Sequence, residues 1–306
     1  MFENQLHIKT EPISFPDLLN HGVTLSMKRE DTIHPLVSGN KFRKLKYNLF
    51  QAKKLDYQCL LTFGGAFSNH ISAVAAAGKE YGFKTIGVIR GDELSDKISE
   101  NPTLAYAQSC GMQMKFVSRE EYKNKLDKDF IERLQETYGR FYLLPEGGTN
   151  TLAVKGCEEI LTEADEMYDY ICASVGTGGT LAGIINASYT HQDIIGFSAL
   201  KGAFQTSEIS KYTKKENYKI IDDYCFGGYA KIDLQLVRFI NEFHQSTGIP
   251  LDPVYTGKMI FGIIELIKNG YFKENSRILA VHTGGLQGIA GMNKKLKKKN
   301  LPQINL

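Results

Sequence analysis

The sequence contains no long apolar run and almost no excess of charge of either sign. No stretch approaches the ~18 uncharged apolar residues that a membrane-spanning helix needs, which excludes a membrane-embedded body. Thirty-seven Lys and Arg residues stand against 34 Asp and Glu, and the formal net charge is +3. That balance does not favour nucleic acid as the main partner. We therefore expect a small-molecule partner, with no nucleic acid and no membrane.

Signals for disulfides, metal sites and export are also absent. The cysteines form no CxxC pair and have no histidine beside them at metal-ligand spacing. They are Cys59, Cys110, Cys157, Cys172 and Cys225. We expect reduced thiols and no metal site. The opening segment MFENQLHIKTE lacks the basic and apolar regions of a secretory signal, so the expected location is the cytoplasm.

The length and composition indicate a folded protein of one large domain or two smaller ones. The chain has 306 residues, of which 42% are hydrophobic and 23% charged, close to the ordinary globular balance. This composition excludes wholesale disorder. No low-complexity linker separates the halves, so domain boundaries are placed only loosely, near residues 45 and 150.

Short apolar runs alternate with segments of helical spacing from Tyr57 onward. This alternation is typical of βαβ units and predicts an α/β class with parallel strands. The predicted strands are 57–63, 84–90, 112–117, 141–145, 168–175, 194–200, 217–221 and 277–283. The predicted helices are 71–82, 102–110, 120–137, 149–164, 181–189, 231–247 and 255–268. Because the pattern restarts after residue 150, the sequence predicts a second sheet.

Three glycine-rich turns follow predicted strands, where open α/β sheets bind their ligands. They are FGGAFSNH (63–70), VGTGGTLAG (175–183) and HTGGLQG (282–288). The second offers backbone N–H groups and a helix N-terminus to an anion, so a phosphate fits there; a tight structural turn is the alternative. A Walker A loop is absent, and a dinucleotide fingerprint would need glycine where Leu181 stands. Nucleotide binding is therefore the weaker alternative.

A cluster of cations follows a turn in SGNKFRKL, residues 38–45. Lys41 and Lys44 share one face of the predicted helix, and Arg43 and Lys46 add positive charge nearby. A lysine that is desolvated among cations can lose its proton near neutral pH and attack a carbonyl. Solvated lysines at this spacing are the common alternative.

The tripeptide Ser68-Asn69-His70 lies between a predicted strand and a predicted helix. Its hydroxyl, amide and imidazole groups could bind a carboxylate or a cofactor oxygen, or move a proton. Ser and Asn are also favoured helix caps, so a functional role requires the other loops to converge here.

Taken together and in order, these motifs resemble the pyridoxal-phosphate (PLP) enzymes of fold type II. More narrowly, they resemble the D-cysteine desulfhydrase and 1-aminocyclopropane-1-carboxylate (ACC) deaminase family. The segments are SGNKFRKL, GGAFSNH, LLPEGGTN, VGTGGTLAG, LDPVYTGK and HTGG, spread from about residue 34 to 288. The resemblance implies a tryptophan synthase β-like fold and a homodimer. It implies a large PLP-binding domain of residues 1–44 and 151–306 and a small inserted α/β domain of residues 45–150, each with a largely parallel sheet flanked by helices.

The resemblance also implies which residues hold the cofactor. Lys41 matches the family lysine that bonds covalently to PLP, and Lys44 matches the family's second lysine. Asn69 matches the residue that bonds the phenolic oxygen. The phosphate loop matches Gly176, Thr177, Gly178, Gly179 and Thr180.

On the substrate side, the resemblance implies three catalytic residues besides Lys41. Ser68 matches the serine near the substrate carboxylate, while Tyr255 and Tyr229 match two active-site tyrosines. Around Tyr229 the family commonly continues with Pro-Asn, whereas this chain has Ala230-Lys231. The chain also loses residues between about 200 and 228, so we expect the substrate side of the pocket to differ.

Two hydroxyl residues favour one branch of the family. ACC deaminases typically have Glu after the tyrosine and Leu before the final Gly-Gly, whereas Thr256 and Thr283 stand there in this chain, as in the desulfhydrase-like branch. A neutral hydroxyl beside the pyridine nitrogen makes the ring a weaker electron acceptor, which suits loss of a good leaving group.

The expected function is PLP-dependent α,β-elimination from a small amino acid, like that of D-cysteine desulfhydrase, with release of an α-keto acid and ammonia. ACC deamination, racemisation and dehydration of a hydroxy amino acid are the enzymatic alternatives. The non-enzymatic alternative is a protein that binds PLP or a nucleotide without turnover.

Overall fold

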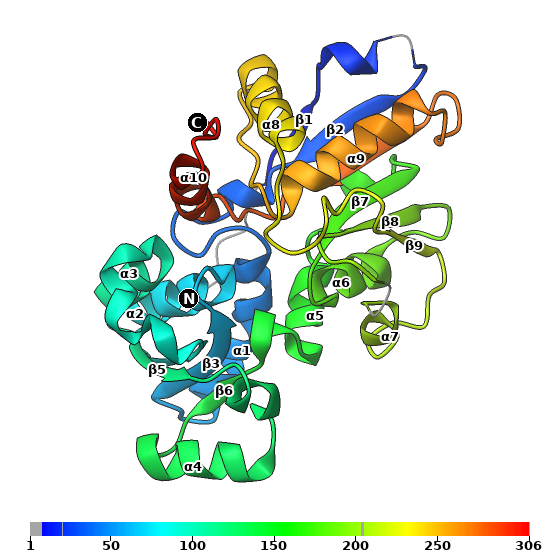
Figure 1. Ribbon diagram of the computed structural model, residues 1–306. Coiled ribbons are helices and arrows are strands. Elements are labelled where there is room, and N and C mark those ends of the chain that lie inside the picture. Colours follow the sequence, from blue (N-terminus) through cyan, green and yellow to red (C-terminus); the bar gives the residue numbers. More distant parts are fainter. Residues whose placement is uncertain (1–7, 20, 203–204, 306) are drawn as a thin grey trace.

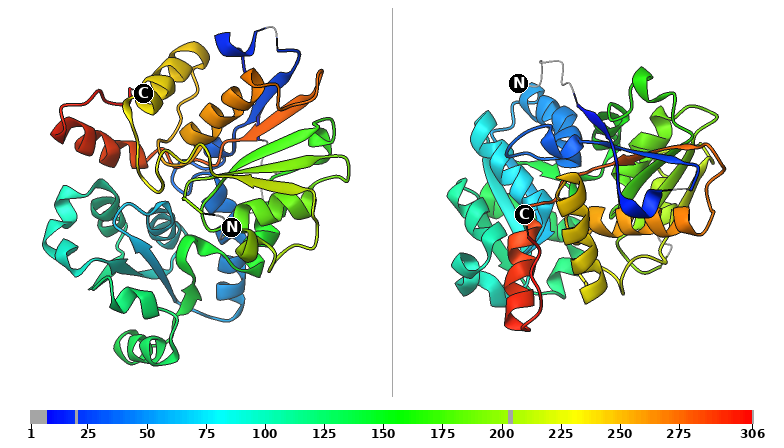
Figure 2. Two further views of the ribbon diagram at one scale, coloured as in Figure 1. Left: turned by 45° about the vertical axis from the view of Figure 1, so that its right-hand side comes forward. Right: turned by 90° about the horizontal axis from the view of Figure 1, so that it is seen from above.

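The chain folds around two β-sheets with helices on their faces (Figure 1). The computed structural model of the protein describes residues 8–19, 21–202 and 205–305. Residues 1–7, which carry most of the segment MFENQLHIKTE, lie outside the described residues. In Figure 2 the segments around the smaller sheet, coloured cyan to green, lie beside the larger sheet.

The larger sheet has six strands in the order β1-β2-β10-β7-β8-β9. Its strands are β1 (Thr10–Pro12), β2 (Thr24–Lys28), β7 (Tyr170–Val175), β8 (Asp193–Ser198), β9 (Tyr218–Ile221) and β10 (Arg277–Val281). All neighbours pair in parallel except β1 and β2, which are antiparallel. The sequence did not predict β1 and β2. One reason is Lys28, whose charge suggests a surface position although its ammonium is buried against Asp165.

The smaller sheet has four strands in the order β5-β4-β3-β6, all parallel. Its strands are β3 (Cys59–Gly65), β4 (Lys84–Arg90), β5 (Gln113–Val117) and β6 (Tyr142–Leu144). The four predicted strands of this half, and the restart of the pattern after residue 150 as a second sheet, are confirmed.

The helices flank both sheets. They are α1 (Asn40–Lys54), α2 (Asn69–Tyr81), α3 (Pro102–Ser109), α4 (Lys128–Tyr138), α5 (Thr151–Glu158), α6 (Gly179–Ala187), α7 (Gln205–Ile209), α8 (Leu234–Thr247), α9 (Thr256–Lys268) and α10 (Gly288–Lys298). Short 3₁₀ helices cover Pro16–Leu18, Glu30–Thr32, Asp92–Glu100, Glu121–Asn124, Glu146–Gly148 and Glu163–Asp165. The short α7 and the C-terminal α10 were not predicted.

Two predicted helices were too long. The segment 120–137 is interrupted at Asp127, whose extended backbone separates a 3₁₀ turn from α4. The segment 149–164 ends as a helix at Glu158. A new 3₁₀ turn then begins after Thr162, where Asp165 and Thr162 form a capping box. In both cases a residue with extended backbone, Asp127 or Thr162, interrupts a pattern that the hydrophobic spacing alone would continue.

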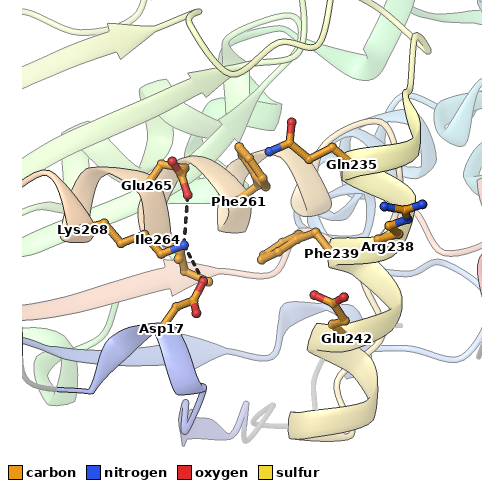
Figure 3. Close-up of a pocket in the computed structure, with 9 residues that line it drawn as sticks. All are labelled: Asp17, Gln235, Arg238, Phe239, Glu242, Phe261, Ile264, Glu265 and Lys268. Carbon is orange, nitrogen blue, oxygen red and sulfur yellow. Dashed lines mark hydrogen bonds and ion pairs between the residues drawn. The ribbon is translucent and has the colours of Figure 1, made fainter.

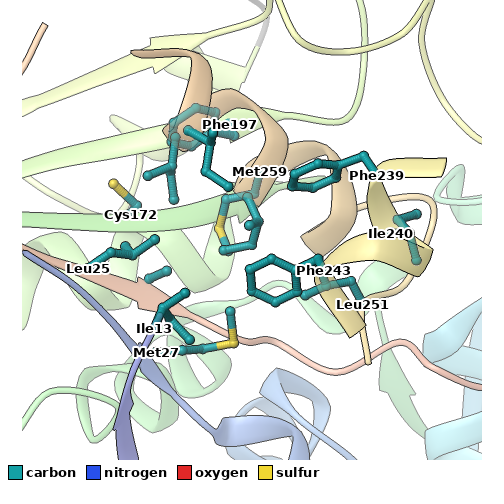
Figure 4. Packing of buried hydrophobic residues seen from close by; sticks show 14 of the residues in the cluster. Ile13, Leu25, Met27, Cys172, Phe197, Phe239, Ile240, Phe243, Leu251 and Met259 are labelled. Atoms are coloured by element: carbon teal, nitrogen blue, oxygen red, sulfur yellow. The ribbon is translucent and has the colours of Figure 1, made fainter. Parts of the chain in front are cut away.

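Both faces of each sheet are buried, as parallel sheets require. On the larger sheet, Cys172 packs with Phe243 and Met259 beneath α8 and α9 (Figure 4), while the next residue back, Ile171, packs on the opposite face with α5 and α6. On the smaller sheet, Leu60 packs with α1 and α2, and its neighbour Leu61 packs with α4. The period of two along each strand therefore distributes side chains to both layers.

Helix α1 connects the two halves, since it packs against both α5 and α2. It is closest to α5 at Gly156, where an added Cβ would lie 2.0 Å from the carbonyl oxygen of Arg43. The division at residues 45 and 150 therefore falls within packed helices and stays a prediction.

Gly156→Ala is expected to lower the free energy of unfolding by roughly 2 kcal/mol or more, because α1 must move away from α5. The denaturant midpoint measures this change. Gly288→Ala is the matched control, because an added Cβ at Gly288 meets nothing within 4 Å. Equal midpoints for the two variants would contradict the close packing.

Candidate active site

A cavity of about 680 Å³ lies where the three glycine-rich turns meet. It is lined by segments that follow β3, β7 and β10, and by the first turn of α1. This position at the carboxyl ends of parallel strands is the one expected for a ligand in an open α/β sheet. Its volume lies within the range of small-molecule sites.

Most of the predicted site residues line this one cavity. They are Lys41, Lys44, Ser68, Asn69, Gly176, Thr177, Gly178, Thr180, Tyr229, Tyr255 and Thr283. Gly179 and Thr256 are not among the lining residues. A smaller groove of about 340 Å³ between α8 and α9, where Lys268 bridges Asp17 and Glu265, contains none of the predicted residues (Figure 3).

The turn before α1 brings two of the motifs into contact. Gly39 has φ +63°, and an added Cβ there would lie 2.0 Å from the carbonyl oxygen of Thr283. The next residue, Asn40, donates its backbone N–H to that same carbonyl and its side-chain amide to Thr180 Oγ1, at 3.2 and 2.8 Å. Only glycine allows this approach, which places the start of α1 between the turns that follow β7 and β10.

Lys41 presents its amine to the cavity. Its Nζ donates a hydrogen bond to the carbonyl oxygen of Gly147 at 3.2 Å. Burial, together with the positive charge of Lys44, lowers the pKa of Lys41 well below its usual range. An unprotonated amine is the form that attacks a carbonyl.

Lys44 lies one helical turn further and is almost fully buried. Its Nζ donates to Gly147 O at 3.0 Å and to Thr149 Oγ1 at 2.9 Å, and it lies 3.4 Å from Thr177 Oγ1. Burial lowers the pKa of Lys44 to about 8. Below that pH the ammonium adds positive charge beside the turn that contains Thr177.

The turn after β7 forms an anion-binding cradle. Gly178, with φ +84°, is the N-cap residue of α6, and the first intrahelical bond of that helix runs from Ala182 N to Gly178 O. The N–H groups of the first turn therefore have no partner within the helix and carry the positive end of its dipole. With Lys44 beside it, this donor set fits the phosphate of PLP.

Ser68 and Asn69 lie at the start of α2. Ser68 is its N-cap residue, and its Oγ accepts a hydrogen bond from Ile71 N at 3.3 Å. The hydroxyl hydrogen of Ser68 can still be donated into the cavity. Asn69 Nδ2 lies only 2.9 Å from where a Cβ would stand on Gly285, which has φ +97°. Its amide therefore occupies space that a side chain at Gly285 would fill.

Tyr255 and Tyr229 form an edge-to-face pair with ring centroids 6.2 Å apart. Burial raises the pKa of both phenols, so both are neutral at neutral pH. Tyr229 keeps 45% of its surface exposed and faces the cavity from its open side.

The two predicted hydroxyl positions differ in access. Thr256 is fully buried; its hydroxyl donates to Asp252 Oδ1 at 2.8 Å and accepts from Asp252 N at 2.9 Å. Thr283 lines the cavity, with its Oγ1 3.1 Å from Ser174 Oγ. Of the two hydroxyls, only that of Thr283 is placed to meet a group in the cavity.

Sequence reasoning missed several lining residues. Gly147 supplies the carbonyl that receives both lysines, and Arg90, Glu146 and Lys295 bring charges to the cavity. His70 was considered but not selected; both of its ring nitrogens are buried without a hydrogen-bond partner, and burial beside two lysines lowers its pKa well below the usual range. For Glu146 and Gly147 the available signal was the segment 143–150, which contains both residues and has two adjacent glycines shortly after a proline.

Comparison with known proteins identifies the family. The model of the pyridoxal-phosphate dependent enzyme family matches residues 5–284. The chain belongs to this PLP-dependent family. The predicted cofactor and enzyme class are thereby confirmed, and so is the fold type II class, because PLP enzymes of that fold superimpose on the chain.

Two curated relatives cover most of the chain. A protein of Thermotoga maritima, provisionally named an ACC deaminase, is 32% identical over 95% of this chain and 98% of its own length. A protein of Arabidopsis thaliana, named a bifunctional mitochondrial D-cysteine desulfhydrase and ACC deaminase, is 30% identical over 89% of this chain and 74% of its own length. The predicted resemblance to this PLP subfamily is confirmed.

Solved structures of similar fold agree. A crystal structure described as an ACC deaminase homologue superimposes with a TM-score of 0.83 at 26% identity, covering 96% of this chain and 95% of its own. An O-acetylserine dependent cystathionine β-synthase of Helicobacter pylori gives 0.63 at 15% identity, covering 94% of this chain and 95% of its own, and shows the shared fold alone. Within the described residues, no helix of this PLP enzyme combines the length and apolar character needed to cross a membrane.

Proposed function

We propose that this PLP enzyme removes the β-substituent and the amino group of a small amino acid, with D-cysteine as the preferred substrate. The observation that carries the proposal is that the amine of Lys41, whose pKa burial lowers, lines the same cavity as the turn before α6 and Ser68. The names of the relatives support the substrate class.

The residues of the cavity divide into those that hold the cofactor and those that act on the substrate. Lys44 and the N–H groups of residues 176–180 would hold the phosphate, the amine of Lys41 would bond the aldehyde carbon, and Asn69 would donate to the phenolic oxygen. When bound, PLP supplies an electron sink for the α-carbon of the substrate.

Proton movement at the substrate is assigned to Lys41 and Ser68. The Lys41 amine would take the α-proton of the bound substrate, and the Ser68 hydroxyl would donate a hydrogen bond to the substrate carboxylate or share in that proton transfer. The β-substituent leaves with its bonding electrons, as thiolate in the case of cysteine. Loss of the α-proton and of the β-substituent leaves an enamine, which tautomerises to an imine. Water then hydrolyses the imine to an α-keto acid and ammonia. The neutral phenols of Tyr255 and Tyr229 line the same cavity, where they would hydrogen-bond the substrate.

ACC deamination is the second candidate, because several relatives carry that name. Against it, the residue after Tyr255 is the hydroxyl residue Thr256, which is bonded to Asp252, and the hydroxyl that lines the cavity belongs to Thr283. Neither is an acid that would keep a ring nitrogen protonated, and cyclopropane opening has no good leaving group to assist it.

A substrate panel tests the proposal. The purified holoenzyme is given D-cysteine, L-cysteine, D-serine, L-serine and ACC, and sulfide, ammonia and keto acid are measured for each. We expect D-cysteine to give the highest kcat/KM. Higher activity on ACC or serine would overturn elimination from cysteine in favour of deamination or dehydration, and a yellow but inert protein would favour binding without turnover.

Assembly, location and domain limits stay proposals, and the family resemblance supports the assembly and the domain limits. We expect a cytoplasmic homodimer with an inserted domain at residues 45–150. Light scattering after size exclusion reports the assembly, and the cleavage sites found by limited proteolysis report the domain limits.

The lowered pKa of Lys44 predicts how phosphate affinity depends on pH. Pyridoxine 5′-phosphate is a suitable probe because it has no aldehyde to bond Lys41. Burial sets the pKa of Lys44 at about 8, so the ammonium that attracts the phosphate is present below pH 8 and lost above it. The affinity for the probe is therefore expected to fall about tenfold for each unit by which the pH rises above 8. Isothermal titration calorimetry measures it.

In Lys44→Met the affinity at pH 7 is expected to fall roughly 10- to 100-fold and to lose its dependence on pH above 8. Lys46→Met is the matched control, because Lys46 pairs with Glu159 and is not among the residues lining the cavity. A pH dependence retained in Lys44→Met would show that another group binds the phosphate.

A further inference from the structure

One buried ammonium group holds the loop that carries Tyr229. Lys258 lies in the first turn of α9 and is 2% exposed. Its Nζ donates hydrogen bonds of 2.8 Å to the carbonyl oxygens of Cys225 and Gly228. Both carbonyls belong to the segment 225–231, which we call the Tyr229 loop.

Lys258 is costly as a packing residue. Burial lowers its pKa to about 8, and the charges of Asp252 and Asp233, which are not hydrogen-bonded to its Nζ, offset that shift only in part. A buried ammonium with no carboxylate in direct contact opposes folding, and two carbonyl partners offset that cost only in part. An apolar side chain of the same length would fill the space without it, so the ammonium has a use other than packing.

The backbone of the Tyr229 loop needs such support. Phe226, Gly227, Gly228 and Ala230 have φ angles of +52°, +81°, +113° and +54°. For Phe226 and Ala230 the left-handed conformation costs about 1 kcal/mol or more each. Such conformations persist where the surrounding structure fixes them, and they gather at functional sites.

The two tyrosines that Lys258 connects, Tyr255 and Tyr229, both line the cavity. Tyr255 is the N-cap residue of α9, three positions before Lys258, and Tyr229 lies between Gly228 and Ala230. The same turn of α9 therefore fixes Tyr255 directly and Tyr229 through the bonds of Lys258. The edge-to-face contact of the two rings depends both on the position of Tyr255 and on the hydrogen bonds of Lys258.

We propose that Lys258 is a positioning residue that holds the Tyr229 loop so that the phenol of Tyr229 faces the substrate side of the cavity. The proposal rests on the proposed function only in assigning Tyr229 to the substrate side. Lys258 itself does not line the cavity and acts through Tyr229.

A double-mutant cycle of Lys258→Met and Tyr229→Phe tests this proposal. Lys258→Met is expected to raise KM for D-cysteine about tenfold and to lower kcat less, with the visible absorption of the bound cofactor unchanged. In the Tyr229→Phe background Lys258→Met is expected to add little, because both changes act through the same phenol. Effects that multiply in the double variant would overturn the proposal.

Hydrogen exchange gives a readout that does not depend on turnover. In Lys258→Met holoenzyme the amides of residues 225–231 are expected to exchange at least tenfold faster, while those of α8 stay as in the wild type. If the wild type is inert on the panel, the proposed function fails, whereas this exchange result still decides the role of Lys258. An unchanged exchange rate of the loop amides in Lys258→Met would overturn the proposed role of Lys258.

Two further variants separate positioning from folding. Lys258→Arg keeps hydrogen-bond donors and is expected to recover most of the wild-type KM. If Lys258→Met does not fold, Lys258→Arg is compared with the wild type instead. A KM raised about tenfold in Lys258→Arg would overturn the proposal. Lys268→Met is the matched control on the same helix, because Lys268 pairs with Asp17 and Glu265 in the groove of Figure 3. A rise in KM for Lys268→Met equal to that for Lys258→Met would also overturn it.

Discussion

Lys41→Ala is expected to abolish the visible absorption band of PLP bonded to lysine and to lower keto-acid release by about 10³-fold or more. Removal of the amine takes away both the covalent bond to the cofactor and the base that receives the α-proton. The neighbouring Lys44 does not replace it, because its ammonium is held by Gly147 and Thr149. Absorption spectra of the purified protein and a coupled keto-acid assay measure the two effects.

Lys46→Ala is the control for Lys41→Ala. Lys46 lies on the same helix, but its Nζ bonds Glu159. We expect Lys46→Ala to keep the band and the activity. A band that survives in Lys41→Ala and disappears in Lys46→Ala would reverse the assignment.

Ser68→Ala is expected to lower kcat about 10²- to 10⁴-fold while the visible band remains. The hydroxyl of Ser68 also caps α2, and loss of a cap alone costs about 1 kcal/mol of stability. Ser68→Gly separates the two roles, because glycine at an N-cap position costs only a few tenths of a kcal/mol. We expect Ser68→Gly to be as inactive as Ser68→Ala but nearly as stable as the wild type, as measured by steady-state kinetics and thermal unfolding.

Asn101→Ala removes a comparable cap outside the cavity. Asn101 caps α3 by accepting from Thr103 N and Leu104 N, and it does not line the cavity. Its loss is expected to lower stability without changing kcat. Recovery of activity in Ser68→Gly would assign the serine a structural role only.

Much of the site could be predicted because its glycines have local conformational requirements. The turn at Gly178 and the C-cap at Gly82 both have φ near +80°, which their positions after a strand or a helix indicate. The spacing of Lys41 and Lys44 on one helix face likewise requires only the period of the helix. Such features depend on a few neighbouring residues, and the sequence contains them.

Other features depend on partners that are distant in the chain. Lys28 is buried because it forms an ion pair with Asp165. The hydroxyl of Thr256 is not available to the cavity because it donates one hydrogen bond to Asp252 and accepts another from it. Gly147 contributes a backbone carbonyl, which no side-chain pattern reports. Which segments line the cavity was thus predictable from the sequence. Which hydroxyl and amine groups reach the cavity could be known only from the tertiary structure.

The strand order of the larger sheet determines when the enzyme can be completed during synthesis. β10, near the end of the chain, lies between β2 and β7 in the middle of that sheet. Until the ribosome has released residues up to 281, β2 and β7 each lack a neighbour and expose an unpaired edge. Thr283 and Gly284, which wall the cavity, emerge after that. Cofactor capture must therefore wait until residues up to 284 have left the ribosome, and a nascent chain truncated before β10 would be a target for chaperones rather than a partly active enzyme.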